Sequence, residues 1–245
     1  MCLSPEVDFV AGTAIAGVGV ATLMAVRRPR DLVIGALPLG FGLHQITEGF
    51  VWLGLRGQVS PALGDAARDA YVIYAQAILP MLVPIGFALL ERDARRRRWL
   101  WPFVVLGVLT GLFLLWQVTH WPILAEERAH CVAYTTHTPY AIPSATAYVL
   151  AVCAPALLSS RRHLRTFGIV NVVGLAFAAT LQEEEFTSVW CLYAAVMSVL
   201  ILAHFRRERA GPDEVDPPGP TPTAGDGAAG RPRGGGPSIT PSSPT

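Results

Sequence analysis

Long apolar segments that alternate with short arginine clusters constrain this chain more than any other feature of its sequence. A helix that crosses the hydrocarbon core of a bilayer needs about 20 apolar residues. Only 15% of the residues are charged, against about a quarter in soluble domains. The pattern predicts an all-α integral membrane protein, a seven-helix transmembrane bundle. The expected spans are Val7–Val26, Leu32–Leu55, Arg68–Leu90, Trp99–Thr119, Ala141–Ser159, Thr166–Gln182 and Phe186–Phe205.

The arginines predict how this bundle lies in the membrane. The chain has no lysine, and 14 of its arginines lie in the four alternate connections that follow the first, third, fifth and seventh spans. Only Arg56, Arg68 and Arg128 lie on the opposite side. Short cytoplasmic loops carry the excess of Lys and Arg, so we expect the N-terminus outside and the C-terminus inside. Arginine in place of lysine, with abundant Ala, Gly and Pro, is typical of GC-rich bacteria, and we expect a bacterial inner (plasma) membrane.

The composition divides the chain into two parts. Residues 1–205 form the expected seven-helix transmembrane domain, and residues 206–245 are expected to be a disordered Pro/Gly-rich cytoplasmic tail. The tail is interpreted as a linker, with docking of a protein partner as the alternative. Small residues four apart, such as Gly12 and Ala16, predict close helix packing inside the bundle. The expected partner is the lipid bilayer, and a net charge of +1 gives no sign of nucleic-acid binding.

The most polar part of any expected span lies in the second one. His44 and Glu48 are four residues apart, so they share one helical face, which Trp52 continues and which Gln45 borders. Glu48 lies seven residues before the outer end of the span, a depth of about 10 Å. A carboxylate at such a depth costs about 2.5–3.5 kcal/mol unless it is paired or protonated. We expect Glu48 to pair with His44, and these four residues are the candidate ligand or proton site.

The outer face offers further candidates for a cation or metal site. The connection after the fourth span contains His130 and His137, and the turn after the sixth contains Glu183 and Glu184. The sequence has no H-E-x-x-H or C-x-x-C motif and no cofactor signature, so an exposed acidic turn is the competing interpretation.

Two further sets of residues are assigned structural roles. A disulfide that joins Cys2 to Cys131 or to Cys191 is one hypothesis, and free buried thiols are the other. Aromatic residues near the expected span ends are interpreted as anchors at the membrane interface. They include Trp99, Trp101, Trp116, Trp121, Tyr71, Tyr134 and Tyr140.

Three short motifs resemble a family of bacterial multi-pass membrane proteins with no assigned function. They are the opening Met1-Cys2-Leu3-Ser4, Gln45-x-x-Glu48-Gly49-x-x-Trp52 in the second span, and Trp190-Cys191-x-x-Ala194-Ala195 in the last. Leu3 replaces the usual Phe of that opening. The resemblance covers residues 1–205 and implies that a shared framework contains Cys2, Gln45, Glu48, Trp190 and Cys191.

The sequence leaves three functions open. A proton-linked or small-ligand sensor or transporter would use the buried His44–Glu48 pair. An intramembrane metal-dependent hydrolase would use His44 or Glu48 as a base or a ligand. A structural or accessory membrane protein would use the same side chains to hold helices together. The sequence favours the first function over an enzyme, because it shows no nucleophile or metal motif.

Overall fold

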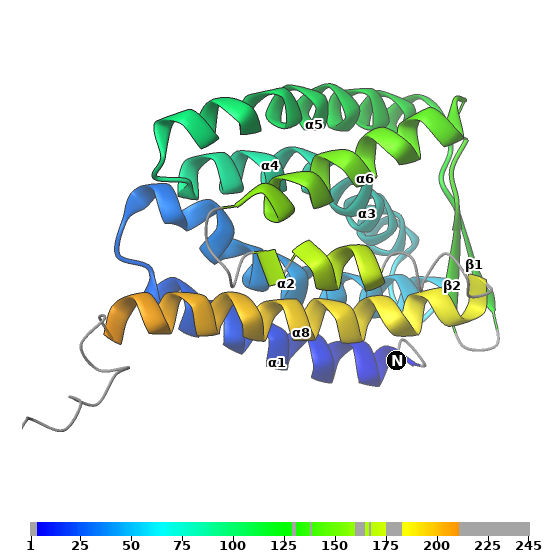
Figure 1. Ribbon diagram of the computed structural model, residues 1–245. Coiled ribbons are helices and arrows are strands. Elements are labelled where there is room, and N and C mark those ends of the chain that lie inside the picture. Colours follow the sequence, from blue (N-terminus) through cyan, green and yellow to red (C-terminus); the bar gives the residue numbers. More distant parts are fainter. Residues whose placement is uncertain are drawn as a thin grey trace, which may run out of the picture.

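The computed structural model describes residues 4–128, 131–137, 139–159, 165–166, 168–174 and 183–210, with side chains described from residue 194 to residue 209 in the last range. The described part is a bundle of helices with one β-hairpin (Figure 1). Its elements are α1 (Pro5–Ala25), η1 (Pro29–Asp31), α2 (Leu32–Leu55), α3 (Pro61–Val72), η2 (Ile73–Ile78), α4 (Leu79–Leu90), α5 (Ala94–His120), β1 (Leu124–Arg128), β2 (Cys131–Thr135), α6 (Ala141–Leu158) and α8 (Glu183–Ala210).

Several helices begin at capping residues that lie outside the apolar stretches. The Ser4 hydroxyl accepts from the Val7 N–H at 3.5 Å, and Pro5 follows at the first turn of α1. Ser60 caps α3 in the same way. The Asp93 carboxylate accepts from the Arg95 N–H at 2.8 Å at the start of α5. These caps satisfy amide groups that the first turn leaves without intrahelical partners, so the helices begin before their apolar segments do.

Four helical stretches are long and apolar enough to cross a membrane within the described residues: Pro5–Ala25, Pro61–Leu90, Ala94–His120 and Ala141–Leu158. Each overlaps an expected span. Helix α2 keeps the expected bounds of the second span, but the polar run from His44 to Glu48 lowers its mean hydropathy and it is not among the four. Only part of the expected sixth span, Thr166–Gln182, falls within the described residues. Helix α8 continues to Ala210, five residues past the expected end of the transmembrane domain at residue 205, and residues 211–245 lie outside the described residues.

Helices α1 and α2 pack more closely than side chains usually allow. A Cβ added to Gly12 would lie 2.7 Å from Ile46 Cγ1 and 2.9 Å from the Gly42 carbonyl oxygen. A Cβ on Gly42 would in turn collide with the backbone of Ala16. The predicted packing role of Gly12 and Ala16 is confirmed, and the contact lies within the chain.

The 30-residue stretch Pro61–Leu90 is one continuous rod with a π-helical segment, η2, at its centre. The Leu79 N–H reaches back five residues to the Tyr74 carbonyl. The next carbonyl, that of Ala75, would need an N–H from Pro80, which has none. The Tyr148 hydroxyl of α6 donates to it instead, at 2.8 Å. Pro80 therefore cannot continue the π pattern, and α6 supplies the missing donor.

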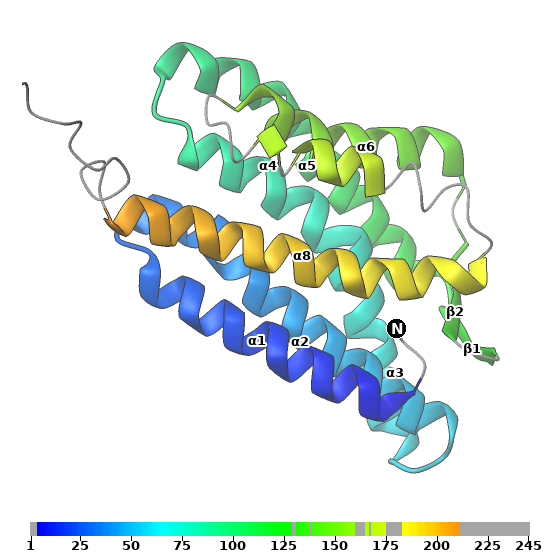
Figure 2. The same cartoon turned by 60° about the horizontal axis from the view of Figure 1, so that its bottom comes forward.

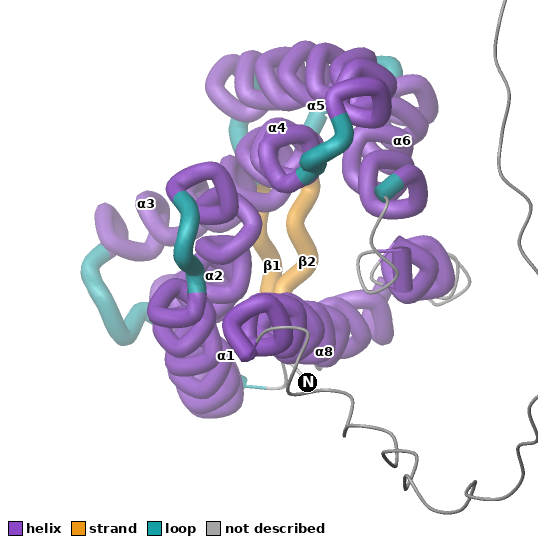
Figure 3. The backbone as a smooth tube through the Cα atoms, turned by 60° about the vertical axis from the view of Figure 1, so that its left-hand side comes forward, coloured by secondary structure: helices purple, strands orange, loops and turns teal. Residues whose placement is uncertain are grey.

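The β-hairpin is an element that the sequence analysis did not predict. Strands β1 and β2 pair antiparallel, with Ala125 opposite Tyr134 and Glu127 opposite Val132. Seen along the bundle, the hairpin crosses one end, from the side of α4, α5 and α6 to that of α1 and α8 (Figure 3). Residues directly opposite share a face. One face therefore carries all four of these residues, and Val132, Tyr134 and Ala125 pack against α2, α3 and the end of α5.

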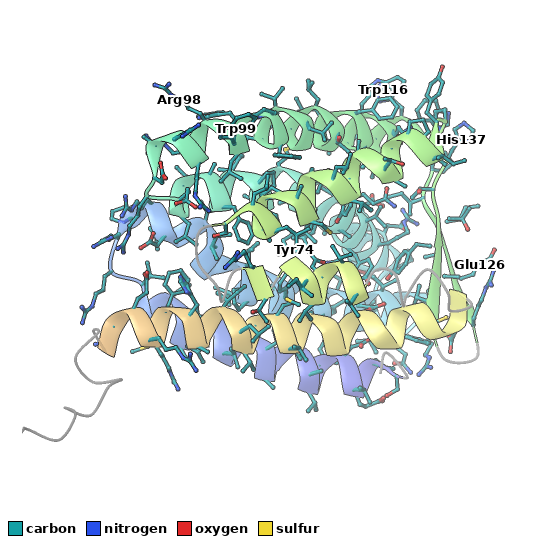
Figure 4. All side chains as sticks on the ribbon, in the orientation of Figure 1. Tyr74, Arg98, Trp99, Trp116, Glu126 and His137 are labelled. Carbon is teal, nitrogen blue, oxygen red and sulfur yellow. The ribbon has the colours of Figure 1, made fainter. Side chains whose placement is uncertain are left out.

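The described arginine clusters gather at the opposite end of the bundle. The connection from α1 to α2, the turn from α4 to α5 and the end of α8 all lie there, while the N-terminus lies at the hairpin end (Figures 1 and 2). Arg98 and Trp99 mark one end and Glu126 and His137 the other (Figure 4). The two ends of the molecule thus differ in charge.

Candidate functional site

Two fully buried carboxyl groups face a single amide between α1 and α2. The Gln45 side-chain amide donates to Asp8 Oδ1 at 2.5 Å and to Glu48 Oε2 at 3.2 Å. Asp8 and Glu48 both have 0% exposed surface, and Gln45 has 4%. We call these three residues the acidic site. Two carboxyl groups that share a donor can hold one proton between them, because two adjacent negative charges in a medium of low polarity repel strongly.

Asp8 is the residue that the sequence analysis missed. It lies one residue inside the expected first span, Val7–Val26, and was not among the candidate residues. In α1 the buried positions recur every three or four residues, and Asp8 precedes Gly12, Ile15 and Gly19 on that stripe. The periodicity of the small residues could have placed Asp8 in the α1–α2 contact.

A column of stacked rings lies next to the acidic site. His44 stacks on Tyr71 with centroids 3.9 Å apart and planes at 12°. Tyr71 stacks on Tyr134 of β2 at 4.6 Å and 16°. The Tyr74 ring also lies near His44, with centroids 4.9 Å apart. The column therefore leads from the hairpin to the interior of the bundle, where Figure 4 labels Tyr74.

This arrangement corrects the expected His44–Glu48 pair. Within the described residues, neither ring nitrogen of His44 has a hydrogen-bond partner, and the ring is held by stacking. Glu48 accepts from Gln45 instead. The spacing of four residues does place both side chains on one face, but the His44 ring stacks on Tyr71 while the Glu48 carboxyl group shares the Gln45 amide with Asp8 of α1.

The assignment of Tyr71 and Tyr134 as interface anchors is also wrong. Tyr71 is 9% exposed and forms part of the buried cluster beneath the hairpin. Burial raises the pKa of the Tyr134 phenol well above its usual range, and the nearby Glu48 and Asp8 raise it further. Tyr140 and Trp99, in contrast, are 74% and 68% exposed, as residues at an interface would be.

Trp52 connects the site region to the surface. Its side chain is 1% exposed, and the Arg56 guanidinium lies 4.9 Å from the centre of its ring. Arg56 also pairs with Glu127 of β1 at 2.9 Å, with both side chains partly exposed. This ion pair fastens the hairpin to the end of α2, and the Glu127 hydrogen bond raises the pKa of Arg56.

The other sequence candidates are not brought into the acidic site. His137 is exposed at the hairpin end, where its ring lies 5.2 Å from that of Trp121. His130 lies outside the described residues, as do the side chains of Glu183 and Glu184 at the start of α8. No group of three or more His, Cys, Asp or Glu side chains is placed to hold a metal ion in the part of the chain that the structure describes.

The disulfide hypothesis stays a prediction. Cys131 is buried at 2% exposure in β2. Cys2 lies outside the described residues, and so does the side chain of Cys191.

The fold and the acidic site define a class of protein before any comparison is made: a helical bundle with several apolar helices of membrane-spanning length and a polar site between two of its helices. Residues 1–215 match the model of DUF6629, a family of unknown function, and the chain belongs to that family. No curated protein and no solved structure matches the chain. The function therefore has to be inferred from the site itself.

Proposed function

We propose that this chain is a proton-linked sensor or transporter of the bacterial inner membrane, and that its proton-binding group is the acidic site. The observation that supports this proposal is the Gln45 amide, which donates to two fully buried carboxyl groups on different helices. Ionisable groups inside a membrane are costly, and they usually mark a pathway or a relay.

The site is suited to hold one proton rather than none. With both carboxyl groups ionised, two negative charges would lie close together among neutral donors and away from water, which is costly. With one carboxyl protonated, its O–H becomes an additional donor, and the amide and the acid together bridge α1 to α2. Gain or loss of that proton changes the contact between the two helices, which is the change that a sensor or transporter needs.

The test is infrared spectroscopy of the full chain in lipid nanodiscs, with Glu48→Gln and Asp8→Asn beside the wild type. Protonated and ionised carboxyl groups absorb at different frequencies, so a pH titration follows the buried proton directly. We expect a protonated-carboxyl band near neutral pH in the wild type that is lost or shifted in both variants. Glu126→Gln, at an exposed position of β1, is the matched control and should leave the band unchanged.

The opposite result assigns the site a structural role. If the wild type shows no protonated-carboxyl band at any pH that keeps it folded, the acidic site does not bind a proton. If the two variants then only lower the unfolding temperature, the three side chains act as a link between helices.

The membrane arrangement is the second part of the proposal: seven spans, with the N-terminus outside and the C-terminus in the cytoplasm. It is supported by the arginine clusters, which alternate along the sequence and gather at one end of the bundle (Figure 1). Alkaline phosphatase and green fluorescent protein, each fused after Ala210, provide the test. We expect a fluorescent and phosphatase-inactive C-terminus; active phosphatase there would contradict the cytoplasmic C-terminus.

A further inference from the structure

The acidic site lies close to one end of the bundle and far from the other. Asp8 is three residues from the start of α1 and 17 from its end at Ala25, or about 5 Å and 25 Å along the axis. Glu48 is seven residues, about 10 Å, from the end of α2 at Leu55. Both short distances lead to the end that the hairpin covers (Figure 3).

Toward the arginine end, the contacts among the described residues close the longer path between α1 and α2. Beyond Asp8, α1 and α2 meet at Gly12 and Gly42, where not even a Cβ fits, and at Gly19, whose Cβ would collide with the backbone of Leu39. An apolar cluster that includes Ile15, Ile34 and Phe41 fills the bundle further along. Neither feature offers polar groups along which a proton could move.

The shorter path, toward the hairpin, is lined with polar groups. Tyr134 covers Tyr71, and Tyr71 covers His44 next to the acidic site. The Tyr134 hydroxyl and both His44 nitrogens are buried and have no hydrogen-bond partner within the described residues. Among the described residues at the surface end of this path, Arg56 forms an ion pair with Glu127, and Glu6 lies close enough to interact electrostatically with Arg56.

We propose that the acidic site exchanges its proton through the hairpin end of the bundle, past Tyr134 and Tyr71, and that the Arg56–Glu127 ion pair limits exchange by holding the hairpin closed. This inference rests on the proposed proton site. It adds the end of the bundle through which the proton exchanges and the contact that limits this exchange. Within the described residues, the titratable groups that face the path come from several elements: Asp8 from α1, His44 and Glu48 from α2, Tyr71 from α3, Tyr74 from η2 and Tyr134 from β2, with Glu6, Arg56 and Glu127 at the surface end.

The experiment is rapid mixing of nanodisc-embedded protein from H₂O into D₂O, with the shift of the protonated-carboxyl band followed in time. Glu127→Gln should speed the exchange about 1.5- to 5-fold, the range expected for an exposed ion pair. The reversed pair, Arg56→Glu with Glu127→Arg, should restore the slow rate. Tyr134→Ala should be faster than Glu127→Gln, because it also removes the ring that covers Tyr71.

Two matched controls make the outcome decisive. Glu126→Gln removes a charge from the other face of the same strand. Glu208→Gln breaks the Arg92–Glu208 ion pair, 3.5 Å long, at the arginine end. Both should exchange like the wild type. Equal acceleration by Glu208→Gln and Glu127→Gln, or none by Glu127→Gln and Tyr134→Ala, overturns the proposed route. A missing band in the wild type instead refutes the proton site, so the two failures are distinguishable.

Discussion

The two ends of the bundle differ in how many charged side chains they carry and in how those side chains are arranged. At the arginine end, charged side chains are numerous and most are exposed, except the buried Asp31 and Glu91, and ion pairs are long, such as Arg92–Glu208 at 3.5 Å and Arg96–Asp93 at 3.9 Å. Near the hairpin end, two carboxyl groups are fully buried around one amide. Exposed pairs contribute little free energy, whereas each buried polar group must be satisfied. The comparison teaches that burial, and not the number of charges, decides where protonation can alter the structure.

The largest expected effect tests whether the α1–α2 contact holds the acidic site together. Gly42→Leu should lower the free energy of unfolding by about 3 kcal/mol or more, because its side chain would overlap the Ala16 backbone. Thermal or denaturant unfolding in detergent measures this loss. Gly17→Leu is the control, since a Cβ there meets nothing within 4 Å. Equal destabilisation of the two variants would contradict the close contact.

The second effect concerns the amide between the carboxyl groups. Gln45→Leu removes the donor that Asp8 and Glu48 share, which should lower the free energy of unfolding by about 1–3 kcal/mol. Chemical denaturation measures the change. Gln58→Leu, at an exposed turn position, should have almost no effect, and a Gln45→Leu protein as stable as this control would show that the amide is dispensable.

A smaller effect is expected at the hairpin. Arg56→Ala should lower the free energy of unfolding by only about 0.2–1 kcal/mol, because the Arg56–Glu127 pair is partly exposed. The same variant should increase proteolysis of the hairpin without affecting the arginine end. A double-mutant cycle with Glu127→Ala measures the coupling energy of the pair. A coupling energy near zero would show that the ion pair does not hold the hairpin closed.

The smallest effect at neutral pH comes from Tyr134→Phe. The folded-state pKa of Tyr134 is raised, so its contribution to stability is complete below the unfolded pKa of about 10 and is lost as pH rises through the folded value. Stability of the wild type should therefore fall more steeply above about pH 10 than that of Tyr134→Phe. Melting temperatures across that range provide the measurement, and parallel pH profiles would contradict the burial of the phenol.

Much of the fold could be predicted because apolar length and arginine position are local properties of the sequence. The bounds of α2 and the approximate extents of α1, α5 and α6 follow from them. The start of α3 at Pro61 was missed, because capping by Ser60 extends a helix beyond its apolar segment. The hairpin was missed because its strands are only five residues long and one of them, Leu124–Arg128, is mostly charged.

The site could be predicted in part for the same reason. Gln45, Glu48 and Trp52 lie on one helix, so their spacing alone placed them together. Asp8 comes from 37 residues away and Tyr134 from a strand, and only tertiary packing brings them to α2. His44 was found, but its partner was wrong, because a spacing of four residues does not say whether a neighbouring helix offers a better contact.

The π segment between α3 and α4 also determines which backbone carbonyl is left to accept from the Tyr148 hydroxyl of α6. The Leu79 N–H now bonds the Tyr74 carbonyl, and the Ala75 carbonyl takes the Tyr148 hydroxyl. A return to ordinary α-helical turns would direct Leu79 to Ala75 and rotate the ring of Tyr74, which contacts His44. The hydrogen bond from the Tyr148 hydroxyl to the Ala75 carbonyl therefore depends on whether the segment between α3 and α4 is π-helical or α-helical.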